Sequence, residues 1–86
     1  MIHQPRRFTV RSGELLIGLI QEMDRVPWVG QWTWALSGTR PNPPAFVWKG
    51  AEKSFDQARA AHAACWAAWL EWAGLQQEQP LRWSSG

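Results

Sequence analysis

Residues 28–37 read WVGQWTWALS and carry the clearest strand pattern in the chain. Within this stretch, Trp32, Trp34 and Leu36 alternate with smaller or more polar residues. Successive side chains of a strand point to opposite sides of the sheet, so this alternation is typical of a strand with one buried face. We therefore predict a half-buried strand with Trp32 and Trp34 in the core and Trp28 at the start of the strand.

The residues that follow predict a loop and then another strand. Residues 38–44 read GTRPNPP, and their three prolines and one glycine exclude regular structure. Residues 45–50, AFVWKG, place Phe46 and Trp48 on one side if the chain is extended. We expect both rings to face the same interior as the preceding strand.

The amino-terminal part admits two interpretations. RFTVR (7–11) and LLIGLIQE (15–22) flank a Ser12-Gly13 turn signal, which predicts a β-hairpin. The apolar residues of 15–23 also fit a helical stripe, but Gly18 would cost such a helix about 1 kcal/mol relative to alanine. Short apolar runs do not separate helix from strand by periodicity alone. We favour the hairpin and keep the helix as the alternative.

Residues 54–74 predict a helix with recognisable ends. Ser54 can cap its amino terminus, Gln57 can complete a capping box, and Gly74 can end it. The alanine-rich sequence between these residues has high helix propensity. At 100° per residue, one arc of this helix predicts a buried face. The residues in that arc are Ala58, Cys65, Trp69 and Trp72.

These elements predict an α+β fold. We expect an antiparallel sheet of three or four strands in the order β-β-β-β-α, with one carboxyl-terminal helix packed on one face. The chain is short enough that residues 1–75 should form a single domain. Residues 76–86 are polar and follow the end of the helix, so we expect them to form a flexible tail.

Several of these stretches together resemble a group of short, uncharacterised bacterial and prophage-type proteins. The resemblance rests on IGLIQE (17–22), WTWAL (32–36), a proline-rich loop and KGAEKSFDQARAAHAACWAAWL (49–70). In that group, a Gly-x-Ile strand and a Trp-x-Trp strand precede an Ala-rich, Trp-containing helix. The similarity spans residues 8–72 and concerns fold-forming residues, so it supports a strand around Gly18 and implies no activity.

A looser likeness is one of topology alone. The amino-terminal DNA-binding domains of phage-type tyrosine recombinases also have a sheet before a helix. In those domains a three-stranded sheet enters the major groove.

Composition and charge limit the class of protein. The chain has eight Trp, three Phe, no Tyr and a formal net charge of +2. The single cysteine, Cys65, excludes an intramolecular disulfide and fits a reducing compartment, so we expect a cytoplasmic location. We find no signal-peptide pattern at the amino terminus. The longest apolar run, Ala63 to Leu70, is far shorter than the roughly 20 residues that span a bilayer, so we expect no membrane partner.

The residues offer little for catalysis or metal binding. His62 and Cys65 lie three apart on the predicted helix, but the only other histidine is His3, and a zinc site needs more ligands than this pair. The sequence contains no phosphate-binding glycine loop, serine elbow or paired-carboxylate motif. We therefore predict a protein that is not an enzyme and has no metal or cofactor.

Two kinds of binding site are predicted instead. Trp28 and Trp66 lie at the margins of the expected core, where exposed aromatic residues often mark partner surfaces. They favour a non-enzymatic interaction module, related to prophage proteins, that binds an unknown protein partner or itself. Arg7, Arg11 and Lys49 are expected to point away from the helix. They favour the alternative, a nucleic-acid-binding domain that uses the exposed basic face of the sheet.

Overall fold

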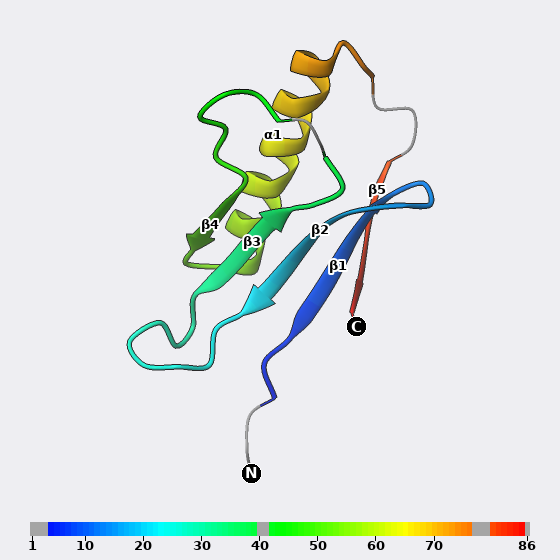
Figure 1. The fold of residues 1–86 in the computed structure, drawn as a ribbon. Helices are drawn as coiled ribbons and strands as arrows, with labels where there is room; N and C mark the ends of the chain where they lie inside the picture. Colours follow the sequence, from blue (N-terminus) through cyan, green and yellow to red (C-terminus); the bar gives the residue numbers. More distant parts are fainter. Residues whose placement is uncertain (1–3, 40–41, 77–79, 86) are drawn as a thin grey trace.

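The computed structural model describes residues 4–39, 42–76 and 80–85, and it shows an antiparallel sheet with one helix packed against it (Figure 1). The elements are β1 (Arg7–Ser12), β2 (Leu15–Glu22), β3 (Trp32–Leu36), β4 (Lys49–Glu52), α1 (Phe55–Ala73) and β5 (Leu81–Ser85). The strand order across the sheet is β4-β3-β2-β1-β5. The predicted α+β class is confirmed, although the sheet has five strands where three or four were expected.

The β1–β2 hairpin confirms the strand interpretation of the amino-terminal region. Arg7 pairs with Gln21, and the register shifts between Val10 and Arg11. This shift adds one residue to β2 and is a β-bulge, which bends a strand locally. Gly18 lies at the bulge, directly beneath α1, and a Cβ atom there would collide with the His62 ring and lie 2.8 Å from the Ala35 carbonyl oxygen. Gly18, which disfavours a helix over residues 15–23, is therefore required because only a residue without a side chain fits between the sheet and α1 here.

Strand β5 corrects the prediction of a flexible tail. Leu81–Ser85 pairs antiparallel with β1, so that Trp83 lies opposite Val10. Leu81 and Trp83 are partly buried against the core, and the Arg59 guanidinium lies 5.2 Å from the centre of the Trp83 ring. Residues 81–85 alternate between apolar and polar side chains, but the segment is short and follows the polar stretch LQQEQP (75–80). Residues 77–79 and 86 of the predicted tail lie outside the described part.

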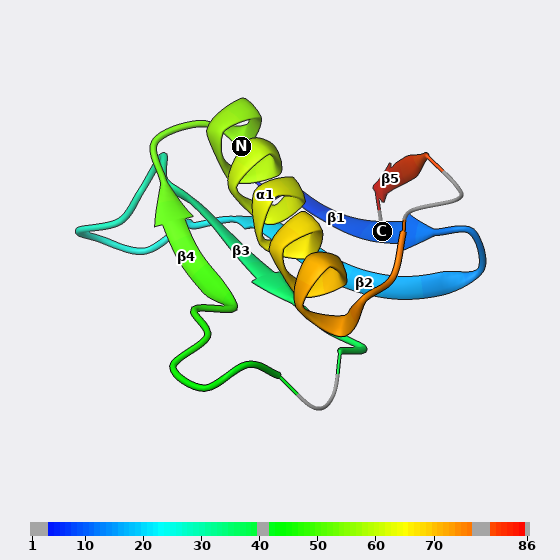
Figure 2. The same cartoon turned by 90° about the horizontal axis from the view of Figure 1, so that it is seen from above.

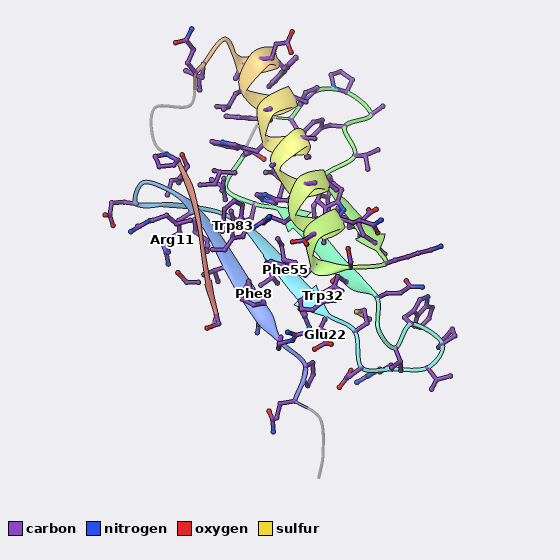
Figure 3. The ribbon with its side chains drawn as sticks, turned by 180° about the vertical axis from the view of Figure 1, so that it is seen from behind. Phe8, Arg11, Glu22, Trp32, Phe55 and Trp83 are labelled. Carbon is purple, nitrogen blue, oxygen red and sulfur yellow. The ribbon has the colours of Figure 1, made fainter. Side chains whose placement is uncertain are left out.

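Helix α1 crosses β2, β3 and β4 on one side of the sheet (Figure 2). Its Ser54 cap is confirmed, because the Ser54 hydroxyl accepts a hydrogen bond of 3.1 Å from the Gln57 amide. Phe55 in its first turn contacts Phe8 and Trp32, with ring centres 4.7 and 5.2 Å apart (Figure 3). The aromatic residues thus join the first turn of the helix to two strands.

The core lies between α1 and this side of the sheet. Its buried hydrophobic residues are Val10, Ile17, Ile20, Trp32, Trp34, Leu36, Ala58, Cys65, Trp66 and Leu70. The prediction that Trp32 and Trp34 are core residues is confirmed.

Two other tryptophans depart from the predicted core. Trp72 is 48% exposed and Trp48 is 43% exposed, although both were expected to face the interior. The helix is rotated so that Trp66 and Leu70 point at the sheet, which turns Trp72 toward solvent. Trp48 precedes the first residue of β4, so the alternation of that strand does not govern its direction.

Candidate functional site: the uncovered face of the sheet

The sheet has a second face that points away from α1. Strand register places Ser84, Thr9, Leu19, Ala35 and Lys49 in one row across all five strands. Directly paired residues share a face, and their chain neighbours Val10 and Gly18 are buried toward the helix. No helix in residues 4–39, 42–76 and 80–85 covers this side, which we call the uncovered face.

Two more rows complete the uncovered face. The first contains Arg7, Gln21, Thr33 and Ala51, one from each of the strands β1 to β4. The second contains Arg82, Arg11 and Leu16 at the hairpin end of the sheet. Polar and cationic side chains therefore surround a centre made of leucine and alanine. The solvent-facing side of a sheet usually carries polar residues throughout. The leucine and alanine at the centre of this face are therefore unusual.

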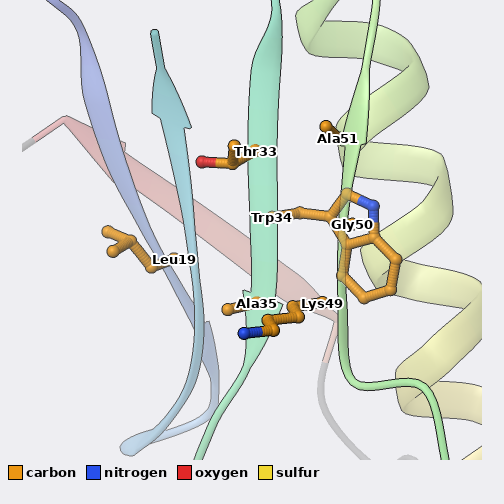
Figure 4. Close-up of a pocket in the computed structure, with 7 residues that line it drawn as sticks. All are labelled: Leu19, Thr33, Trp34, Ala35, Lys49, Gly50 and Ala51. Carbon is orange, nitrogen blue, oxygen red and sulfur yellow. The ribbon is translucent and has the colours of Figure 1, made fainter.

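Three adjoining hollows run along the uncovered face. The central hollow, of about 500 Å³, is lined by Leu19, Ala35 and Lys49 among others (Figure 4). A second hollow of about 530 Å³ shares Leu19 and Ala35 with it and extends to Trp48. A third, of about 240 Å³, shares Thr33 and Ala51 with the central one and extends to Trp28. The hollows thus form one shallow groove that ends at an exposed indole on each side.

Charge is divided between the two faces of the sheet. The charged strand residues of the uncovered face are Arg7, Arg11, Lys49 and Arg82. The two acidic strand residues, Glu22 and Glu52, lie on the helix side, where both pair with Trp32. Within the described strands, the uncovered face therefore carries positive charge and no carboxylate.

Two arginines occupy paired positions at the hairpin end of the sheet. Arg11 and Arg82 are direct partners in the β1–β5 pairing. Arg11 Nη1 donates to the Glu14 carbonyl oxygen at 3.4 Å, and Arg82 Nη2 donates to the Gly13 carbonyl oxygen at 3.2 Å. These carbonyls orient the guanidinium groups but do not neutralise them. Like charges placed directly opposite destabilise a sheet, so this pair costs stability in the absence of an anion.

The predicted site residues do not all lie on the uncovered face or along its groove. Arg7, Arg11 and Lys49 lie on the uncovered face, and their contact with nucleic acid stays a prediction. Trp28 is 52% exposed and lines one end of the groove. Trp66 is only 4% exposed, which corrects its assignment as a partner contact. Its indole stacks on that of Trp69, with ring centres 5.7 Å apart, and takes part in the core.

Two residues of the uncovered face were missed in the sequence. The sequence predicts Arg82 in a flexible tail and Trp48 in the core. A signal for Arg82 was present, since Leu81 and Trp83 alternate with it. For Trp48 the sequence contains no such signal, because the direction of its side chain depends on how the loop before β4 returns to the sheet.

His62 and Cys65 are buried between α1 and the sheet. His62 Nε2 donates to the Ile17 carbonyl oxygen at 3.1 Å, while its Nδ1 is buried and has no partner among the described residues. Burial lowers the pKa of His62 and raises that of Cys65. The Cys65 thiol donates to the Val47 carbonyl oxygen at 3.3 Å. Residues 4–39, 42–76 and 80–85 contain no group of three His, Cys, Asp or Glu side chains that could hold a metal ion.

We expect His62 to make stability depend on pH. Below its ordinary pKa of about 6.5, the unfolded chain takes up a proton that the folded protein resists, because burial lowers the pKa of His62. The contribution of His62 to the free energy of unfolding should therefore be constant above pH 7 and fall as the pH decreases through 6, by at most about 1.4 kcal/mol per unit. Urea unfolding at pH 7.5, 6.5 and 5.5 measures this loss.

The matched control for this prediction is His62→Gln. Its amide can still donate to the Ile17 carbonyl but does not titrate. The difference in stability between the two proteins should shrink or reverse toward pH 5.5. Parallel pH profiles for both proteins would show that His62 is not the group responsible.

Comparison with known proteins identifies no relative: no family model, no curated protein and no solved structure matches this chain. Over the described ranges, no helix combines the length and the apolarity that crossing a bilayer requires.

Proposed function

We propose that this protein is a non-enzymatic binding module and that the uncovered face of the sheet is its recognition surface. The observation that carries the proposal is the groove between Trp28 and Trp48, which leaves an apolar floor open to solvent on a sheet whose other face is packed. Concave, mostly apolar surfaces with a few charged groups at their margins are the usual form of a binding site. A cytoplasmic location and a relation to prophage-type proteins stay predictions from the sequence.

The charge of the face favours a partner that differs from the protein itself. In a face-to-face dimer, the cations Arg7, Arg11, Lys49 and Arg82 of one copy would meet the same set in the other. Like charges across an interface oppose association. We therefore propose that the uncovered face binds an anionic partner rather than a second copy, and that light scattering reports the monomer mass.

Leu19→Glu tests this surface, with Ala67→Glu as the matched control. Leu19 lies at the centre of the groove, whereas Ala67 is an exposed residue of α1. Tagged wild-type protein and both variants are expressed in the native host, and the molecules retained with each are compared. The Leu19→Glu variant should lose the anionic partner, because it places a carboxylate on an apolar floor between cations. The Ala67→Glu variant should retain it.

Two results would contradict the proposal. One is an equal set of retained molecules for the wild type and Leu19→Glu, provided that circular dichroism shows both to be folded. The other is a dimer in light scattering that Leu19→Glu dissociates, which would identify the face as a site of self-association.

A further inference from the structure

We infer that the uncovered face binds single-stranded nucleic acid, with phosphates held by its arginines and lysine and a base stacked on the exposed ring of Trp48. This inference rests on the proposed function and specifies its partner. It requires three properties of the face: separated cations, an accessible aromatic ring, and a shape that suits a single strand better than a duplex.

The cations are spread over the full width of the sheet. Lys49 is on β4 at one edge, Arg82 is on β5 at the other, and Arg7 and Arg11 lie near the two ends of β1. A ligand that neutralises all four must carry several negative charges along an extended chain. A nucleic-acid backbone has this property, because each nucleotide adds one phosphate. An anion with a single charge could satisfy only part of the set.

The Trp48 indole supplies a platform for stacking. It is 43% exposed and lines the same hollow as Leu16 and Leu19, which are apolar neighbours suited to the face of a base. The Lys49 ammonium lies over the Trp48 ring, 5.0 Å from its centre, so it covers one face of the indole and a base would stack on the opposite face. Aromatic rings next to cations are the recurring elements of single-strand binding surfaces.

The shape of the face disfavours a duplex. Five strands at about 4.8 Å spacing separate the edge strands by about 19 Å. The major groove of B-DNA is about 12 Å wide, so the sheet as a whole is too broad to enter it, unlike the three-stranded sheet of the recombinase domains. A duplex resting on the face would offer phosphates to the cations but no base to Trp48. Of these two ligands, only a single strand offers unstacked bases to the apolar floor.

Fluorescence anisotropy tests the inference with end-labelled oligonucleotides. The probes are a 15-nucleotide oligothymidylate, the corresponding oligouridylate, a mixed-sequence duplex of equal length, and a labelled oligoglutamate peptide. We expect the two single strands to bind at 50 mM salt and the other two to bind at least tenfold more weakly. With three to four phosphates neutralised, affinity should fall about 20- to 50-fold between 50 and 200 mM salt.

Matched variants separate the two kinds of contact. Trp48→Ala should weaken binding about 5- to 150-fold, whereas Trp72→Ala, which removes an equally exposed indole on α1, should leave it unchanged. Arg82→Gln should weaken binding because it removes one phosphate contact. The slope of the logarithm of the binding constant against the logarithm of the salt concentration should become less steep by about 0.7, the value for one phosphate of a single strand. Lys53→Gln, an exposed cation outside the sheet, is its control. Arg82→Gln keeps the test informative if Trp48→Ala fails to fold.

The outcomes distinguish this inference from the proposed function. Absence of binding to both single strands at 50 mM salt would overturn the inference, as would preferred binding of the duplex or the oligoglutamate. An equal loss with Trp48→Ala and Trp72→Ala would overturn it too. If Leu19→Glu nevertheless removes a partner retained from the host, the uncovered face remains the recognition surface and only its ligand changes. If Leu19→Glu has no effect either, the proposed function fails as well.

Discussion

Trp34→Ala should lower the free energy of unfolding by about 3 to 5 kcal/mol, which is the usual cost of removing a buried aromatic side chain. Trp34 is 7% exposed, packs edge-on against the His62 ring with centres 6.5 Å apart, and donates from its indole nitrogen to Glu52 Oε2 at 3.1 Å. Its removal would leave a cavity and an unpaired carboxylate. Domains of this size have a stability of only about 5 to 15 kcal/mol. Urea denaturation followed by circular dichroism measures the loss.

Trp72→Ala is the matched control, because it makes the same chemical change at a residue that is 48% exposed. Surface substitutions of this kind usually change stability by about 0.5 kcal/mol. The midpoint of urea unfolding should therefore differ clearly between the two variants. Similar midpoints would show that the indole of Trp34 does not contribute to the core as its burial indicates.

Gly18→Ala is expected to be almost as destabilising, at about 3 kcal/mol, although it adds only one methyl group. That methyl group would collide with the His62 ring and lie 2.8 Å from the Ala35 carbonyl oxygen. The carbonyl belongs to the backbone of β3, so relief requires the strands or the helix to move. Forcing extra atoms into a packed core typically costs about 1 to 3 kcal/mol. Thermal unfolding of the purified variant measures the effect.

A double-mutant cycle separates the two collisions. His62→Ala removes the ring but leaves the β3 carbonyl, so Gly18→Ala should cost less in the His62→Ala background than in the wild type. A remaining cost is expected from the contact with Ala35. Strict additivity of the two substitutions would mean that the Gly18 backbone and the His62 ring do not meet in the folded protein.

Much of the fold could be predicted because its signals are local. The alternation around Trp32 and Trp34, the turn at Ser12-Gly13 and the Ser54 cap each depend on residues close together in the chain. Strand β5 was missed for the opposite reason. Its five residues form a strand because β1 offers a free edge and because Trp83 finds the Arg59 guanidinium and the core.

For the candidate site, too, local patterns could be predicted and contacts between distant segments could not. The alternation of strand residues predicted that Arg7, Arg11 and Lys49 share a face. It could not predict the exposure of Trp48 or the burial of Trp66, because both depend on the rotation of α1 and on the return of the loop before β4. A helix with tryptophans on several sides does not indicate by itself which of them meets the sheet.

The sequence by itself determined β1 to β4 and α1, since hydrophobic alternation, turn residues and helix caps act over a few neighbouring residues. It also determined that the rows containing Arg7 and Lys49 would be opposite to those containing Trp32 and Trp34. Only the tertiary structure decided which side of α1 would meet the sheet and that β5 would bring Arg82 beside Arg11. These arrangements depend on contacts between distant segments, and they create the uncovered, cationic groove in which a function can be sought.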